Sequence, residues 1–127
     1  MSGHFEKLIS GITKQLKLVF GSSEQGVYIY FDDTHKVCNK KFSSMLGYKS
    51  PEEWAKVNEN IPAAFVAEKS IMTLIKTYRR AMEKRVGSNI KITWKQKSGG
   101  VVNTNVILVP IAYENHLMAL HFVSKSK

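Results

Sequence analysis

The first hydrophobic pattern in the chain repeats at steps of three and four residues, which predicts an amphipathic helix over residues 4–20. Its apolar face holds Phe5, Leu8, Ile9, Ile12, Leu16, Val19 and Phe20. A Gly-Ser-Ser sequence then ends the helix, because glycine and serine favour turns over helix. We therefore expect residues 1–23 to form a capping or dimerisation helix, and residues 24–127 to form the main domain.

After this helix, residues 26–31 are rich in β-branched and aromatic side chains that alternate along the chain, which predicts a β-strand. The residues that alternate with Tyr28 and Tyr30 are Val27, Ile29 and Phe31. A short polar turn separates this strand from residues 35–38, which predict a second strand. The two strands are expected to pair as a hairpin.

The middle of the chain carries the start and stop signals of three helices. Asn39 is a favoured N-cap for a short helix that follows it. Ser50 and Pro51 predict the next helix, because serine caps a first turn and proline suits the first helical position. A long third helix is expected to begin near residues 64–66 and to end at Val86. Its predicted buried stripe is Ile71, Leu74, Ile75, Tyr78 and Met82.

Three more strands are predicted after this helix, over residues 90–95, 101–111 and 117–123. This order of elements predicts an α+β fold, a five-stranded antiparallel sheet with the helices packed on one face. The last two strands are apolar on both alternations. One alternation holds Val106, Leu108, Ala119 and His121, and the other holds Ile107, Val109, Leu120 and Phe122. In a sheet with one solvated face, apolar and polar side chains should alternate along each strand. We therefore expect the helix 4–20, alone or with a partner subunit, to cover the second face.

Four short motifs then occur in a characteristic order. Residues 26–32 read Gly-Val-Tyr-Ile-Tyr-Phe-Asp, and residues 39–48 fit the pattern Asn-x-x-Phe-x-x-x-x-Gly-Tyr. Residues 50–54 contain Ser-x-Glu-Glu, and residues 94–99 form a strand that runs into a turn. In this order and at these spacings they resemble the PAS family of sensory domains. The resemblance covers residues 24–124, which is almost everything except the first helix.

Membership of that family would imply a sensory or signal-transduction domain whose sheet curls around an internal pocket. Such domains bind small molecules, haem or flavin, or they dimerise, so we expect a homodimer and a partner signalling protein. The cofactor is unknown, but two of the family's modes are disfavoured. Cys38 precedes Asn39 and ends its strand, whereas the flavin-binding light sensors carry their reactive cysteine after such an asparagine. Residues 64–86 contain no histidine, which disfavours haem ligated from the long helix.

The predicted pocket lies between the long helix and the concave face of the sheet. Its candidate lining residues are Phe42, Leu46, Trp54, Phe65, Ile71, Ile75, Tyr78, Trp94, Thr104, Val106 and Leu108. Because few polar groups converge there, we expect any ligand to be small and apolar or aromatic. The alternative is that these residues form an ordinary packed core.

Titratable residues show no catalytic constellation and no spacing typical of a metal site. We therefore expect no enzymatic activity and no metal. His121 lies inside a strand, and we expect a structural or surface role for it ahead of a ligand contact. A small α+β enzyme or ligand carrier that uses the same cavity remains the alternative.

The formal net charge of +9 would attract nucleic acid or an anionic surface. However, the 19 basic residues are scattered along the chain, so we do not expect a nucleic-acid partner. A basic regulator associated with nucleic acid stays a second alternative. No apolar run approaches the roughly 20 residues of a membrane span, and the lone cysteine suits a reducing compartment, so we expect a cytoplasmic protein.

Overall fold

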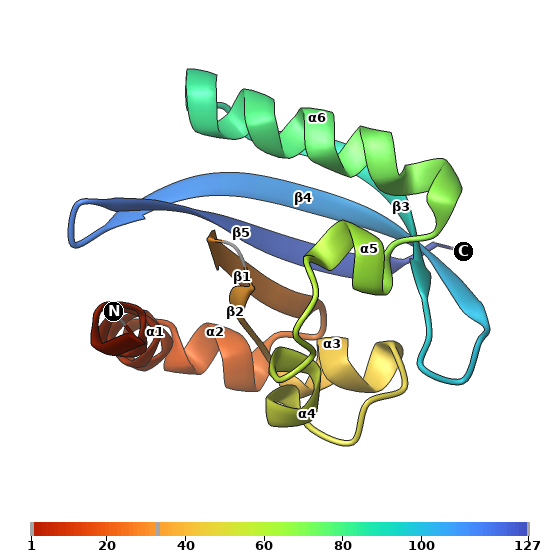
Figure 1. The fold of residues 1–127 in the computed structure, drawn as a ribbon, viewed down its shortest axis with the longest axis horizontal. Helices are drawn as coiled ribbons and strands as arrows, with labels where there is room; N and C mark the ends of the chain where they lie inside the picture. The colour runs from red at the N-terminus through yellow and green to blue at the C-terminus, as the bar shows by residue number, and fades with distance from the viewer. Residues whose placement is uncertain (1, 33, 127) are drawn as a thin grey trace.

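One antiparallel sheet of five strands organises the chain, with the strand order β2-β1-β5-β4-β3. The computed structural model describes residues 2–32 and 34–126, and all of their side chains except those of residues 2–5 and 22. The strands are β1 (Gly26–Asp32), β2 (His35–Cys38), β3 (Ser88–Lys95), β4 (Val101–Tyr113) and β5 (His116–Lys125) (Figure 1). The predicted five-stranded antiparallel sheet is confirmed, as is the hairpin of β1 and β2.

Strand register decides which side chains meet on the inner face of the sheet. β1 and β5 pair so that Tyr28 lies opposite His121, and β5 and β4 pair so that His121 lies opposite Leu108. Directly opposite residues of an antiparallel pair project to the same face. Tyr28, His121 and Leu108 therefore form one row across three strands on the side that the later helices cover.

Four helices follow the hairpin, where three were predicted. They are α3 (Lys40–Met45), α4 (Pro51–Ala55), α5 (Ile61–Phe65) and α6 (Glu68–Lys84). Both predicted caps are present. The side chain of Asn39 accepts a hydrogen bond from the backbone N–H of Phe42, and Ser50 Oγ accepts one from the backbone N–H of Glu53 (3.0 Å).

The long helix expected from residues 64–66 to Val86 is α6, which begins at Glu68 and ends at Lys84, and an extended link separates it from the unpredicted short helix α5. Within this link, Val66 forms an isolated antiparallel bridge with Trp94, and the backbone N–H of Ala67 donates to the carbonyl of Thr93 (2.9 Å). β3 is an edge strand, so its outer backbone groups are free to pair with this segment. That tertiary pairing has no counterpart in helical periodicity, which explains why the sequence pattern missed the extended link and the later start of α6.

The N-terminal segment covers the opposite face of the sheet, as predicted. It forms α1 (Ser2–Gln15) and α2 (Lys17–Ser22), with a break at Leu16, where a single helix was expected. A second hydrophobic cluster joins these helices to β1 and β5. Its buried members are Leu8, Ile12, Val27, Ile29, Phe31, Met118 and Leu120. This cluster confirms the expected α+β arrangement, with helices on both faces of the sheet (Figure 1).

The residues predicted for a dimer interface contact the chain's own sheet. Leu8 and Ile12 are buried there, while Ile9, Leu16, Val19 and Phe20 are half-buried. The side chain of Phe5 lies outside the described residues. Their place in a dimer interface stays a prediction.

Candidate functional site

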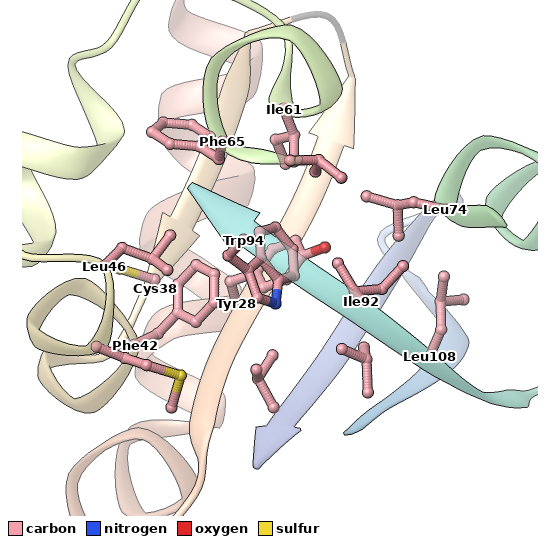
Figure 2. Packing of buried hydrophobic residues seen from close by; sticks show 14 of the residues in the cluster. Tyr28, Cys38, Phe42, Leu46, Ile61, Phe65, Leu74, Ile92, Trp94 and Leu108 are labelled. Atoms are coloured by element: carbon pink, nitrogen blue, oxygen red, sulfur yellow. The ribbon is translucent and has the colours of Figure 1, made fainter. Parts of the chain in front are cut away.

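Aromatic rings fill much of the space between the sheet and the helices α3, α4 and α5. Phe42 stacks on Tyr28, with ring centroids 4.9 Å apart, and meets Trp94 edge-on at 5.2 Å. Trp54 lies 5.3 Å from Phe42 and 5.2 Å from Phe65. Figure 2 shows Tyr28, Phe42 and Trp94 close together at the centre of this cluster. All five rings are fully buried, so they form tightly packed core.

One polar pair inside this aromatic core has its partners, whereas the indole N–H of Trp54 and the Tyr28 hydroxyl have none among the described atoms. The indole N–H of Trp94 donates to Thr104 Oγ1 (2.8 Å), and the Thr104 hydroxyl donates to the carbonyl of Ile92 (2.8 Å). Trp94 and Thr104 therefore hold strands β3 and β4 together from the inside. Neither offers a free hydrogen bond to a ligand.

A cavity of about 290 Å³ opens beside the aromatic core, between helices α5 and α6 and strands β1 and β5. Its lining residues are Tyr28, Tyr30, Asn60, Ile61, Pro62, Leu74, Ile75, Tyr78 and His121. None of these described residues carries a charged aspartate, glutamate, lysine or arginine side chain. The cavity therefore suits a small uncharged molecule, because burying an unpaired charge is costly.

Of the residues predicted to line a pocket, Ile75 and Tyr78 contact this cavity. The others lie in the neighbouring core and are Phe42, Leu46, Trp54, Phe65, Ile71, Trp94, Thr104, Val106 and Leu108. Sequence reasoning did not select Tyr28 and Tyr30, although their shared alternation in the first strand was a usable signal. The register of β1 on β5 places His121 beside Tyr28, and this register cannot be read from the sequence alone.

His121 and Tyr28 form the floor of the cavity as a stacked pair. Their ring centroids are 3.8 Å apart, the rings are within 7° of parallel, and His121 is only 2% exposed. Among the described atoms, neither His121 Nδ1 nor the Tyr28 hydroxyl has a hydrogen-bond partner. Buried polar atoms without partners are rare in folded proteins, and each one calls for an explanation.

Burial keeps both members of this pair uncharged. It lowers the pKa of His121 from 6.5 to about 3, although the backbone carbonyls of Tyr28 and Ala119 oppose the shift. Burial also raises the pKa of the Tyr28 hydroxyl well above its ordinary value. At neutral pH the floor therefore offers a neutral imidazole nitrogen and a neutral phenol.

A buried lysine anchors the segment that leads into the cavity wall. Lys36 is 3% exposed, and its ammonium group donates to the carbonyls of Val57 (2.8 Å), Ala55 (3.3 Å) and Thr34 (3.4 Å). It also lies 5.3 Å from the centroid of the Trp54 ring, at cation–π distance. Burial lowers the pKa of this lysine. Lys36 therefore ties β2 to the end of α4, just before the α5 residues that line the cavity.

Other cofactor chemistry has few candidates within the described residues. No group of three or more histidine, cysteine, aspartate or glutamate side chains there could hold a metal ion. Cys38 is buried, and burial raises the pKa of its thiol to about 12. The disfavoured cysteine–flavin and helix-histidine haem modes stay predictions. No described helix is long and apolar enough to cross a membrane.

Solved structures share this fold over nearly the whole chain, whereas no family model and no curated protein matches the sequence. The PAS domain of a protein from Colwellia psychrerythraea has 19% identity and a TM-score of 0.71, covering 91% of this chain and 97% of that one. The chain has the PAS fold. The PAS domain of an HTR-like protein from Haloarcula marismortui has 15% identity and a TM-score of 0.64, covering 98% of this chain and 99% of that one.

A further PAS domain, from a two-component sensor histidine kinase, has 12% identity and a TM-score of 0.67. It covers 92% of this chain and 97% of that one. These likenesses confirm the fold that the motifs implied. In this PAS fold the cavity lies between the long helix α6 and the inner face of the sheet.

Proposed function

We propose that this chain is a sensory module that binds a small, uncharged, mainly apolar or aromatic molecule in the cavity beside α6. The observation that carries the proposal is the stacked pair at the cavity floor, with His121 Nδ1 and the Tyr28 hydroxyl both buried and unpaired. A ligand with one hydrogen-bonding group would satisfy either atom. The PAS fold, found in the sensor histidine kinase domain above, agrees with a regulatory role.

The cavity's volume and chemistry limit the ligand. Ligand pockets generally range from about 300 to 1,000 Å³, so a cavity of about 290 Å³ suits a small molecule. The walls offer apolar side chains from Ile61, Leu74 and Ile75 and aromatic rings from Tyr30 and Tyr78. A flat ring with one hydroxyl or ring N–H fits these walls and the polar floor together.

Titration of ¹⁵N-labelled protein with phenol and with indole tests this site. We expect chemical-shift changes to concentrate at amides of residues that line the cavity. Ile75→Phe should weaken binding by about tenfold or more, because the larger ring occupies cavity volume. Met72→Phe is the matched control, since Met72 lies on the same helix but is 56% exposed.

Two results would contradict the proposal. One is a wild-type protein whose cavity amides do not respond to either probe, and whose native mass spectrum after purification shows no bound molecule. The other is an Ile75→Phe variant that binds the probes as well as the Met72→Phe control does. Either result would favour a domain that acts through protein contacts alone.

Homodimerisation through the first helix and the outer sheet face belongs to the same proposal. Ile107 supports it, because this outward side chain of β4 is 43% exposed beside the face that α1 and α2 cover. Light scattering of the full chain should give the mass of two chains. Ile107→Lys should shift the mass toward one chain, since a buried unpaired ammonium opposes association, whereas Met72→Lys on α6 should not. A single-chain mass for the wild type would exclude this dimer.

A further inference from the structure

A second hollow, of about 580 Å³, lies between the N-terminal helices and α3, away from the cavity beside α6. Lys17 at the start of α2 and Lys40 and Lys41 in the first turn of α3 all line it. A hollow of about 390 Å³ adjoins it and is lined in part by Lys125 near the end of β5. The two hollows share Lys41 and Ser44 as lining residues, so they are neighbours, and we name them together the lysine groove.

The lysine groove brings together lysines from separate parts of the sequence. Its four lysines come from α2, α3 and β5, and all four are exposed. Over residues 2–32 and 34–126 the ion pair found is that of Lys97 with Glu53, so none of the four is paired with a carboxylate. One carboxylate, that of Glu24, lines the groove beside them. The groove therefore has a clear excess of positive charge on a chain that is already strongly basic.

Hydroxyl groups line the same groove. Thr13 Oγ1 is buried and has no hydrogen-bond partner among the described atoms, although Thr13 lines the larger hollow. Ser44 lines both hollows. Hydroxyl donors interspersed with lysine ammonium groups are the usual partners of phosphate oxygens.

We propose that the lysine groove binds an anionic ligand that carries two or more linked phosphate groups. Two neighbouring hollows that share Lys41 suit adjacent phosphates, which would accept hydrogen bonds from ammonium groups on both sides. A concave site favours a small molecule over a flat bilayer. Among the described lining residues of the groove, the aromatic side chain is that of Phe20, which is half-buried in the second hydrophobic cluster. This lining therefore lacks the exposed aromatic rings on which single-stranded nucleic acids stack. This site is separate from the cavity beside α6, so its test does not depend on the proposed sensory ligand.

Calorimetric titration of the full chain with inorganic triphosphate in low-salt buffer tests the groove. Wild type should bind, and the affinity should fall as salt is added. The double variant Lys40→Gln, Lys41→Gln should lower the affinity about tenfold through the loss of two charged contacts. The double variant Lys69→Gln, Lys76→Gln removes the same charge from exposed positions on α6 and should change the affinity by less than about twofold.

A second variant tests the proposal independently if the double lysine substitution disturbs the structure of α3. Thr13→Val preserves the shape of the side chain and should weaken triphosphate binding about threefold by removing the hydroxyl. Absence of triphosphate binding to the wild type would overturn the proposal, as would an equal loss in the α6 double variant. Tighter, Lys40- and Lys41-dependent binding of a single-stranded oligonucleotide or of phosphatidylserine vesicles would overturn it in favour of a polyanionic macromolecule or a lipid surface.

Discussion

Replacing Asn39 with alanine should lower the free energy of unfolding by about 3 kcal/mol. Asn39 is 4% exposed, and its side chain makes four hydrogen bonds. Its Oδ1 accepts from the backbone N–H groups of Val27 (2.9 Å) and Phe42 (3.0 Å). Its Nδ2 donates to the carbonyls of Phe20 (3.2 Å) and Gln25 (3.1 Å). One side chain therefore joins α2, β1 and α3, and alanine would leave these backbone groups without partners.

Urea denaturation of purified variants measures this loss. Asn39→Asp should be intermediate, because it keeps the accepting oxygen and loses both donated bonds. Asn60→Ala is the matched control, since Asn60 caps α5 by accepting a single bond from Ala63 and is exposed, and it should cost about 1 kcal/mol. If Asn39→Ala cost no more than Asn60→Ala, Asn39 would not be a tertiary junction.

Acidification should destabilise the fold through His121. Its pKa is lowered from 6.5 to about 3 in the folded chain, chiefly because the ring is buried. Because the pKa is lower in the folded chain, the unfolded chain binds the proton first as the pH falls. The contribution of His121 to stability is therefore fully present above the unfolded pKa, and it is lost as the pH falls toward the folded pKa. Between about pH 7.5 and about pH 5 this contribution amounts to about 2 kcal/mol of unfolding free energy.

The variant His121→Phe separates this effect from other titrations. Phenylalanine can keep the stack on Tyr28 but cannot take up a proton, while the other histidines and the carboxyl groups stay in place. We expect the wild type to lose about 2 kcal/mol more than the variant between the two pH values, as measured by urea denaturation. Equal losses in the two proteins would show that His121 is accessible to protons in the folded state.

Local signals in the sequence predicted the framework well. Asn39 and Ser50 begin helices as their capping chemistry predicted, and the alternation of residues 26–31 gives a strand. The apolar face of the first helix predicted a cover for the outer sheet face, and Leu8 and Ile12 are buried there. These features depend on neighbouring residues, so hydrophobic period and backbone chemistry suffice to predict them.

Less of the candidate site could be predicted, because it depends on which residues meet across the sheet. Ile75 and Tyr78 follow from the helical stripe of α6, but the cavity also needs Tyr28 and His121. Their stacking requires the register of β1 on β5. The aromatic residues chosen as lining, such as Phe42, pack against one another because rings gain most from close contact with other rings.

By itself the sequence determined the order of the strands, the caps of α3 and α4 and the need to cover both faces of the sheet, since these follow from patterns within about one element's length. Tertiary structure alone decided three things. It separated the short helix α5 from α6, because Val66 pairs with the free edge of β3. It placed His121 on Tyr28, and it brought Lys17, Lys41 and Lys125 to one groove. Each of these joins residues far apart along the chain, and only the folded backbone sets such distances.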